Sequence, residues 1–392
     1  MSITAQKIGS SPLRLDWTHL TQEHKKVDIA RIQNAWSKLK SRFDSQEIGF
    51  YSTPVSSALS QHEACVSLAE QLTQQGWIKD VLFLGIGGSS LGPLCLLSAL
   101  EHKRKNQISF HFVENPDPID CTLKLKKLAP SSTLICAVTK SGSTFETISL
   151  LLVALEWLGR ERWKKQVIAI TDPAKGDLKK LAQAEGLACL DVAPSIGGRF
   201  SVFTPVGLFA ATLAGLDTKE FMKGALQVRE AFEKNPVDKN PIALIAEQLI
   251  EQYSKRPIHV MMPYSTPLRL TADWWVQLWG ESLGKDGKGF TPLASIGATD
   301  QHSILQLLRD GPDDKVTWFI TVSDVENPVR IPKLGSTVRK ELGSFVLLEE
   351  HSLHDLLLTE YKATALVMTK KNKPHFSIHL DQLDERAMGA LF

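Results

Sequence analysis

Two apolar runs of strand length each lead directly into a turn rich in glycine and hydroxyl side chains. The first run, residues 81–84, continues as Gly85-Ile86-Gly87-Gly88-Ser89-Ser90, and the second, residues 134–138, continues as Thr139-Lys140-Ser141-Gly142-Ser143-Thr144. Glycine lets a backbone come close to a ligand, and the free amides at the start of a helix favour an anion, phosphate above all. Two such turns in one parallel sheet predict a site for a small phosphorylated molecule.

The order of apolar runs along the chain predicts an α/β fold with two doubly wound parallel sheets. Runs of strand length alternate with longer amphipathic stretches, and runs that are apolar throughout suit a parallel sheet covered on both faces. We expect the strands of the first sheet at 81–86, 109–114, 133–139 and 166–171, and those of the second at 258–262, 293–296, 316–322, 365–368 and 375–380.

The same order predicts three parts. Residues 1–50 form an N-terminal extension that is mostly helical in pattern, with one apolar stripe made by Ile29, Ile32, Ala35, Trp36 and Leu39. Residues 51–205 form the first α/β domain. Residues 206–392 hold a second α/β domain and its helical connection, and the mainly helical pattern spans about 195–250.

Composition narrows the range of partners and locations. The 392 residues carry a formal net charge of +2, which does not indicate nucleic acid or an acidic membrane as a partner. No apolar run is long enough to span a bilayer. The five cysteines are unevenly spaced and form no C-x-x-C pair. We interpret them as reduced thiols of a cytoplasmic protein.

Two stretches fit the G-x-S-x-G pattern of the serine hydrolase nucleophile elbow. They are Gly88-Ser89-Ser90-Leu91-Gly92 and Gly280-Glu281-Ser282-Leu283-Gly284. The two matches cannot both be the nucleophile elbow. No Asp and His stand out as the catalytic partners that such a serine needs. A hydrolase is therefore the weaker interpretation of the first turn.

Two further motifs have structural or metal-binding interpretations. Ser143-x-x-Glu146 is a capping box, which is expected to start a helix whether or not phosphate binds there. Lys140 is not needed for capping and favours the phosphate interpretation. Glu349, Glu350, His351 and His354 have the helical spacing of metal ligands. The sequence offers no third fixed ligand, which disfavours a metal site.

Three candidate catalytic side chains come from other clusters. Arg199 follows Gly197-Gly198 and would present a guanidinium from a tight turn, unless it is a surface residue of a connecting loop. Glu281 shares a helix face with Gln277. Tryptophans at 274, 275 and 279 predict burial, which raises the pKa of a carboxylate and suits a general base. A buried Glu281 paired with Lys285 is the alternative.

His302 is the last of these candidates. It ends the stretch Gly297-Ala298-Thr299-Asp300-Gln301-His302, between a predicted strand and a predicted helix. A lone histidine at such a junction is more often a cap or a satisfied core residue than a catalytic group.

Taken together, these clusters resemble the glucose-6-phosphate isomerase (phosphoglucose isomerase) family. The resemblance rests on residues 86–93, 139–147, 197–201, 277–285 and 297–302, which fall in the family's order, and Gly280-Glu281-Ser282-Leu283-Gly284-Lys285 is especially specific. It implies two sugar-isomerase domains and no metal or organic cofactor. It also implies interconversion of glucose 6-phosphate and fructose 6-phosphate through a cis-enediol(ate), in glycolysis and gluconeogenesis.

The resemblance further implies a role for each matching residue. The phosphate would be held by Ser89, Thr139, Lys140, Ser141 and Thr144, with Gln277 assisting and Gly88 lining the sugar. Glu281 would move a proton between C1 and C2, and Arg199 would stabilise the enediolate. His302 would help to open the sugar ring, reaching across from the other subunit of a homodimer.

One part of the family pattern has no counterpart here. In the family, the pattern at 384–391 runs on through another helix, whose motif supplies a glutamine to the phosphate and a lysine to ring opening. No residue up to Phe392 matches that lysine. We therefore expect ring opening to suffer more than proton transfer, and an apolar patch to remain exposed where that helix would dock.

The competing interpretation is a sugar-phosphate-binding regulatory protein on the same fold. Binding alone needs no base, so the presence of Glu281, Arg199 and His302 together favours an enzyme. The unmatched lysine favours the regulatory protein.

Overall fold

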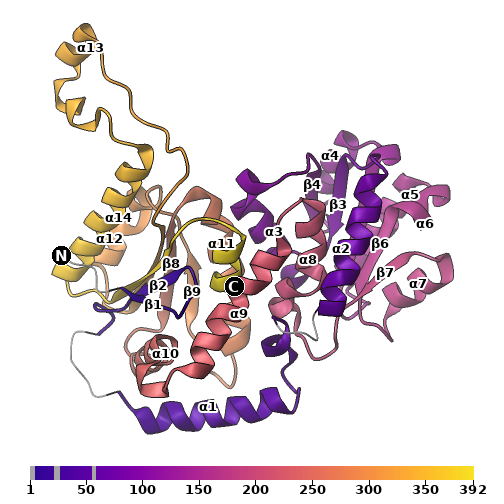
Figure 1. Cartoon of the computed structure of the whole chain (residues 1–392), viewed down its shortest axis with the longest axis horizontal. Helices are drawn as coiled ribbons and strands as arrows, with labels where there is room; N and C mark the ends of the chain where they lie inside the picture. Colours follow the sequence, from indigo (N-terminus) through magenta and orange to yellow (C-terminus); the bar gives the residue numbers. More distant parts are fainter. Residues whose placement is uncertain (1–4, 22–26, 55–58) are drawn as a thin grey trace. The chain divides into compact units, whose positions relative to one another are not determined.

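The structure, a computed structural model, describes residues 5–21, 27–54 and 59–392. The chain divides into two compact units, each built around one β-sheet (Figure 1). The first unit comprises Ala30–Glu230 and Asp384–Phe392, and the second comprises Met1–Ile29 and Ala231–Leu383. These borders differ from the three predicted parts, because an N-terminal strand pairs with the second sheet and the last helix packs on the first unit.

The sheet of the first unit is parallel throughout, in the order β4-β3-β5-β6-β7. Its strands are β3 Asp80–Leu84, β4 Ser109–Val113, β5 Thr133–Thr139, β6 Val167–Thr171 and β7 Ala188–Asp191. The strands predicted here are confirmed, and β7 is one that the sequence did not predict. β3 and β5 are neighbours although β4 separates them in the chain. The winding therefore reverses between them, and ligands bind doubly wound sheets at the carboxyl ends of such strands.

Helices connect the strands in both units. Those of the first unit or at its border are α1 Ile29–Asp44, α2 Leu59–Gln74, α3 Leu91–Ala99, α4 Pro118–Lys127, α5 Phe145–Leu158, α6 Trp163–Gln166, α7 Asp177–Glu185, α8 Pro205–Leu213, α9 Thr218–Lys234 and α15 Glu385–Leu391. Those of the second unit are α10 Pro241–Glu251, α11 Arg269–Leu283, α12 Gln301–Asp310, α13 Ser336–Glu341 and α14 Leu353–Lys370. The predicted helical segment holds α8, α9 and α10. Among the described residues, no helix is long and apolar enough to cross a membrane.

Helices cover both faces of the first sheet. On one face, Leu82 and Ile135 belong to a buried cluster with Leu151 of α5. Alternate residues of the same strands, such as the buried Phe83, point to the other face. On that side α8 contacts both α2 and α3 (Figure 1). Burial on both faces explains why these strands are apolar throughout instead of alternating.

The sheet of the second unit is mixed, in the order β1-β2-β11-β10-β8-β9. Its strands are β1 Gln6–Lys7, β2 Leu13–Asp16, β8 Ile258–Tyr264, β9 Thr291–Ala294, β10 Lys315–Val322 and β11 His375–Leu380. β8 to β11 are parallel, as predicted, whereas β1 and β2 add an antiparallel edge. The prediction of a mostly helical N-terminal extension is therefore wrong for these strands and right for α1. β2 buries only Leu13 and Leu15, too short an alternation to predict a strand.

The strand predicted at residues 365–368 is also wrong. These residues lie inside α14, which begins with a complete capping box between Ser352 and Asp355. The buried residues of this helix are Tyr361, Thr364 and Met368, spaced three and four apart. This helical period outweighs the short apolar run that suggested a strand.

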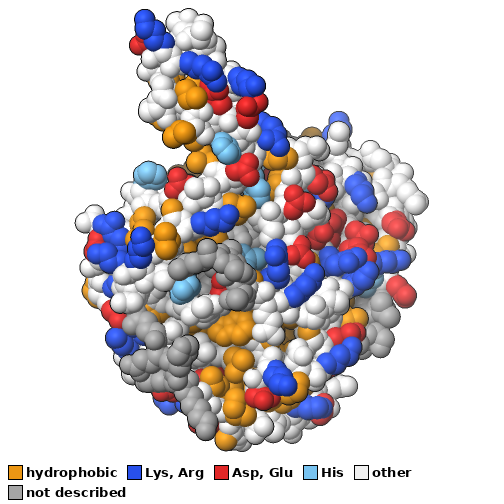
Figure 2. All heavy atoms as spheres, turned by 60° about the vertical axis from the view of Figure 1, so that its left-hand side comes forward, with side chains coloured by type: hydrophobic (Ala, Val, Ile, Leu, Met, Phe, Trp, Pro, Cys, Tyr) orange, Lys and Arg blue, Asp and Glu red, His pale blue; other side chains and the backbone are white. Residues whose placement is uncertain are grey.

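Residues 323–352, between β10 and α14, leave the second unit as an arm that carries α13 (Figure 1). A β-bridge between Arg330 and Ser352 closes the base of the arm. Val329, Phe345 and Leu347 are 68%, 53% and 82% exposed on it. In the space-filling view, hydrophobic side chains of this projection lie among charged ones (Figure 2).

Candidate active site

The two glycine- and hydroxyl-rich turns follow β3 and β5 at the carboxyl edge of the first sheet. These strands pair in parallel, with Leu84 opposite Ala137, so the turns that follow them are neighbours at the switch point. The prediction that both turns follow strands of one parallel sheet is therefore confirmed. This is the edge at which doubly wound proteins place ligands.

The first turn begins a helix that lacks a polar cap. Gly87–Ser89 forms a 3-10 turn, with Ile86 as its N-cap residue, and continues into α3. Isoleucine has no side-chain acceptor for the first amides of the helix. Gly87 has a positive φ of 57°, a conformation that glycine adopts at no steric cost. The amides at this helix start are thus not occupied by a side-chain cap.

The loop that carries Arg199 packs directly against the first turn. A Cβ on Gly88 would lie 2.2 Å from the carbonyl carbon of Gly198, and the Ser201 hydroxyl donates to the Gly88 carbonyl at 3.0 Å. The Arg199 guanidinium lies 4.5 Å from the centroid of the Phe200 ring. Phe200 in turn stacks on Phe50 with a centroid separation of 4.2 Å. The structure therefore brings Gly88 and Arg199 together and supports the guanidinium on an aromatic stack.

The second turn gathers three hydroxyl groups. The Thr139 Oγ1 lies 2.8 Å from the Thr144 Oγ1 and 3.3 Å from the Ser141 Oγ, and the last two are 3.2 Å apart. Gly142, with a φ of 74°, turns the backbone between them. Lys140 follows β5 directly, and its Nζ donates to the Pro194 carbonyl at 2.7 Å. That contact ties the second turn to the loop that leads to Arg199.

The predicted capping box at Ser143 is wrong. Thr144 is the N-cap residue of α5, and its side chain makes no capping hydrogen bond. The Ser143 hydroxyl instead donates to the Asp177 carboxylate at 2.9 Å and accepts from the Asp177 amide at 3.3 Å, at the start of α7. It fails to cap α5 because it lies one residue too early. The first amides of α5 are consequently not capped by a side chain.

Gln277 and Glu281 lie in the second unit, on the last two turns of α11. The Gln277 Nε2 donates to the Glu281 Oε2 at 3.3 Å, so the predicted common face is confirmed. The predicted burial of Glu281 is wrong, because its side chain is exposed while Trp274 and Trp275 are buried. Lys285 Nζ donates to the main-chain carbonyls of Glu281 and Ser282 at the end of the helix.

His302 lies in the first turn of α12 and is exposed, so it is no core residue. Neighbouring side chains hold the loop before it. The Asp300 carboxylate accepts from the Ile296 amide at 2.8 Å, and Gln301 Nε2 donates to the Tyr264 hydroxyl at 2.6 Å. The backbone at His302 is therefore fixed while its imidazole stays accessible.

Glu281 and His302 lie near opposite ends of the parallel strands of the second sheet, Glu281 towards their amino ends and His302 at their carboxyl ends. From residue 269 to residue 281, α11 runs back from the carboxyl end of β8 over about 18 Å at 1.5 Å per residue. A Cβ on Gly280 would contact the Pro292 ring at the start of β9. β9 is parallel to β8 and returns the chain to the carboxyl edge before α12 begins. Within one chain, the two side chains thus stand at different ends of the same sheet.

The structure does not support a serine hydrolase elbow at either G-x-S-x-G match or a metal site at residues 349–354. Ser90, the nucleophile of the first G-x-S-x-G match, is fully buried and donates to the Glu114 carboxylate. Ser282 lies inside α11, not on a strand-to-helix turn. Glu349 pairs with Arg339, whose hydrogen bond lowers the pKa of Glu349 to about 2. No cluster of three or more metal-ligating side chains occurs among residues 5–21, 27–54 and 59–392.

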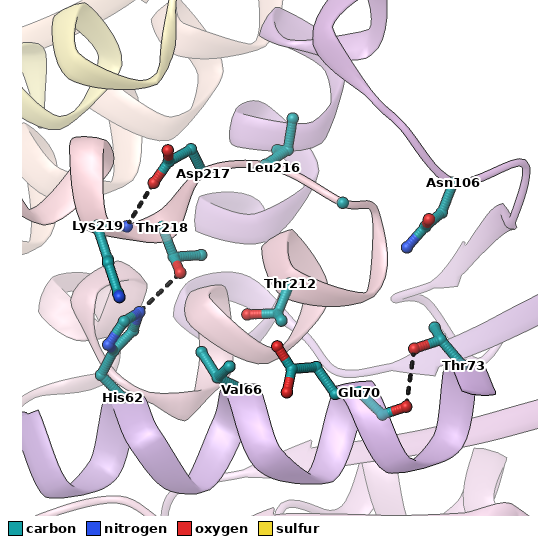
Figure 3. Close-up of a pocket in the computed structure, with 11 residues that line it drawn as sticks. His62, Val66, Glu70, Thr73, Asn106, Thr212, Leu216, Asp217, Thr218 and Lys219 are labelled. Carbon is teal, nitrogen blue, oxygen red and sulfur yellow. Dashed lines mark hydrogen bonds between the residues drawn. The ribbon is translucent and has the colours of Figure 1, made fainter.

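A cavity of about 340 Å³ in the first unit does not involve the predicted residues (Figure 3). It lies between α2, the loop at Asn106 and the turn before α9. His62 Nε2 lies 2.7 Å from the Thr218 hydroxyl, and burial lowers the pKa of this histidine. The Asn106 amide donates to the Leu213 carbonyl at 2.9 Å. These polar groups serve the local fold.

Two residues near the turns escaped the sequence analysis. Glu114 contacts Ser90, and Pro194 accepts from Lys140. Glu114 carried a signal, because it is the last residue of the strand predicted at 109–114, and residues at that end of a parallel strand lie where ligands bind. Pro194 contributes its main chain, which no side-chain pattern can reveal.

The first unit has the architecture in which α/β proteins bind phosphorylated ligands, with two helix starts converging at a switch point. The chain matches the phosphoglucose isomerase family over residues 70–392. It belongs to that family, which confirms the resemblance read from the motifs.

Named relatives agree with this assignment. The glucose-6-phosphate isomerase of Rubrobacter xylanophilus is 39% identical over 340 residues, covering 84% of this chain and 78% of the relative. That of Carboxydothermus hydrogenoformans is 34% identical over 382 residues, covering 92% and 81%.

Solved structures support the fold. A hypothetical protein from Thermus thermophilus has a TM-score of 0.86 at 29% identity, covering 97% of this chain and 91% of that one. A glucose-6-phosphate isomerase from Chlamydia trachomatis has a TM-score of 0.78 at 19% identity, covering 98% and 82%. The predicted α/β class with parallel sheets is thus confirmed.

Proposed function

We propose that this protein is an aldose–ketose isomerase that interconverts D-glucose 6-phosphate and D-fructose 6-phosphate, a step of glycolysis and gluconeogenesis. Family membership and the names of relatives at 34–39% identity support this activity. The observation that carries it is the pair of helix starts without side-chain caps at the switch point between β3 and β5. Nothing in the comparisons favours the regulatory alternative.

The phosphate binds at the two turns. Ser89, Thr139, Ser141 and Thr144 supply hydroxyl donors, and Lys140 supplies a positive charge. Lys140 gives up or shares its bond to the Pro194 carbonyl when the phosphate arrives. A charge-assisted bond to a phosphate is stronger than one to a neutral carbonyl, so the exchange favours the ligand.

Proton transfer occurs between C1 and C2 of the open-chain sugar. Glu281 removes the C2 proton of glucose 6-phosphate, and the electron pair forms a C1–C2 double bond as the C1 carbonyl oxygen takes up negative charge. Arg199 stabilises this cis-enediolate electrostatically. A proton moves from O2 to O1, Glu281 returns its proton to C1, and the C2 carbonyl forms, which yields fructose 6-phosphate. Gln277 orients the Glu281 carboxylate and assists at the phosphate, Gly88 lines the sugar, and the steps use no metal or organic cofactor.

The active site is completed in a homodimer, with His302 of one subunit serving the Glu281 of the other. Two observations support this arrangement. Glu281 and His302 lie near opposite ends of the strands of one sheet, so one chain does not bring them together. The arm exposes Val329, Phe345 and Leu347, and apolar side chains exposed on a projection mark a surface for another protein. We infer that this arm meets the second subunit.

A cytoplasmic location fits the cysteines. None of the five cysteines, all of which lie in the described ranges, forms a disulfide, and Cys65, Cys95 and Cys136 are buried. Burial raises the pKa of the Cys65 thiol to about 12, which keeps it protonated and unreactive.

A coupled assay on fructose 6-phosphate tests the proposed function. The wild-type protein is expected to produce glucose 6-phosphate, and Glu281→Gln is expected to bind substrate without turnover. Binding of fructose 6-phosphate by the wild type without any conversion would favour the regulatory alternative. No binding at all would reject both.

A further inference from the structure

Glu114 stands at the carboxyl edge of the first sheet, next to the first turn. It follows β4 directly, and the register that sets Val113 opposite Leu84 brings it beside Gly85. Its Oε1 accepts a hydrogen bond from the hydroxyl of Ser90, which is fully buried. A half-buried carboxylate is thus joined to the residue that ends the Gly87–Ser89 turn.

The Ser90 hydroxyl has a second acceptor within reach, the Gly87 carbonyl at 3.2 Å. A hydroxyl has one proton, so it donates fully to one of the two. The Gly87 carbonyl already accepts from the Ser90 amide at 3.0 Å. A charged acceptor makes the stronger bond, which favours Glu114. This bond fixes Ser90 against β4 and thereby fixes the turn that Ser90 closes.

The charge of Glu114 is unfavourable for the proposed ligand. No Lys, Arg or His lies within ion-pair distance of its carboxylate in the part of the chain that the structure describes. A carboxylate at the same edge as a bound phosphate repels it. Glu114 can therefore support phosphate binding only through the hydrogen bond that its Oε1 accepts from Ser90.

We propose that Glu114 is a positioning residue of the phosphate site, which acts through Ser90 to hold the first turn in its binding geometry. The inference rests on the proposed function, since it assigns the phosphate to this turn. The residue touches Ser90 and acts on the ligand only through the turn.

Three variants separate the hydrogen bond from the charge. Glu114→Ala removes both, Glu114→Gln keeps an acceptor oxygen without the charge, and Ser90→Ala removes the donor. The dissociation constant of fructose 6-phosphate is measured by calorimetry, KM and kcat by the coupled assay, and Tm without ligand.

Glu114→Ala and Ser90→Ala are each expected to weaken binding and raise KM by roughly three- to tenfold, the value of one hydrogen bond. Both should leave kcat within about twofold, because the proton-transfer groups are untouched. The double variant should bind no more weakly than either single one, since both remove the same bond. Glu114→Gln should bind as tightly as the wild type or more tightly.

Glu114→Gln binding as weakly as Glu114→Ala would overturn the inference, as would unchanged binding in Glu114→Ala and Ser90→Ala. A loss of kcat and Tm with unchanged KM would also overturn it, because it would indicate a purely structural role. Lys140→Ala distinguishes the two proposals. If Lys140→Ala weakens binding and Glu114→Ala does not, only the role of Glu114 fails. A wild-type protein that binds no fructose 6-phosphate would overturn both.

Discussion

Gly88 approaches Gly198 so closely that a Cβ on Gly88 would lie 2.2 Å from the Gly198 carbonyl carbon. The first turn and the loop of Arg199 therefore meet backbone to backbone. The Ser201 hydroxyl, which donates to the Gly88 carbonyl, fastens the same contact. In the proposed mechanism, this contact sets the guanidinium of Arg199 relative to the phosphate.

Gly88→Ala is expected to separate these two segments and reduce kcat/KM at least about 100-fold, because misplaced catalytic groups lose most of their effect. Gly198→Ala is the matched control. A Cβ there would meet only the Gly88 Cα, at 4.0 Å, which is an ordinary contact. Steady-state kinetics of both variants checks the prediction, and equal losses would contradict it.

Lys140→Ala is expected to weaken binding of fructose 6-phosphate by about tenfold or more, because it removes a charge-assisted bond to the phosphate. The fold should persist, since the side chain makes one hydrogen bond at the surface. Lys126→Ala, an exposed lysine on α4, is the control for the loss of one positive charge. Calorimetry measures the dissociation constant of fructose 6-phosphate for both variants, and equal values would reject the role of Lys140.

Buried histidines of the second unit are expected to make it sensitive to acid. Burial lowers the pKa of His259 to about 3 and those of His375 and His379 to about 4, against about 6.5 when unfolded. Below about pH 6.5 the unfolded state binds more protons than the folded one, so the free energy of unfolding falls as the pH falls towards about 4. Above about pH 6.5 these histidines are mostly neutral in both states, so they do not change the free energy of unfolding with pH.

His259→Phe should make that dependence shallower by up to about 1.4 kcal/mol per pH unit, the contribution of one proton. Phenylalanine suits the site, because His259 stacks on Phe290 and its ring nitrogens have no hydrogen-bond partner in the described ranges. Denaturant unfolding at several pH values between about 4 and 7 measures the slope. An unchanged slope would show that His259 does not titrate on unfolding.

Hybrid dimers test the sharing of His302. Glu281→Gln and His302→Ala chains should each be nearly inactive alone and recover activity when unfolded and refolded together, because one site of the hybrid then has both groups. Ideal random mixing gives half hybrid dimers, each with one complete site, so about a quarter of the wild-type activity is expected. A monomer in sedimentation, or no recovery in hybrids, would contradict a shared site.

The strands and turns of the first unit could be predicted because burial on both faces leaves a continuous apolar run that ends in a distinct turn. The edge strands β1 and β2 could not, since Leu13 and Leu15 make too short an alternation. The strand predicted at residues 365–368 was wrong because a short apolar run has the same composition in a helix and in a strand. Their helical state depends on a capping box at Ser352, thirteen residues upstream of residue 365.

Within the candidate site, residue types could be predicted better than their surroundings. The hydroxyl cluster of Thr139, Ser141 and Thr144 follows from a turn at a strand end. The bond between Ser143 and Asp177 joins residues far apart in the chain and has no local pattern. Glu281 was expected to be buried because tryptophans surround it in sequence, yet those at 274 and 275 face the core while the carboxylate does not.

The most direct test of the account is hydrogen exchange during turnover in deuterated water, followed by proton NMR. The wild-type protein is expected to convert fructose 6-phosphate to glucose 6-phosphate with deuterium at C2, because a carboxylate base exchanges its proton with solvent between the two transfers. Glu281→Gln should still bind fructose 6-phosphate but incorporate deuterium at least about 100-fold more slowly. Incorporation at the wild-type rate in Glu281→Gln would contradict the account, since the base would then lie elsewhere.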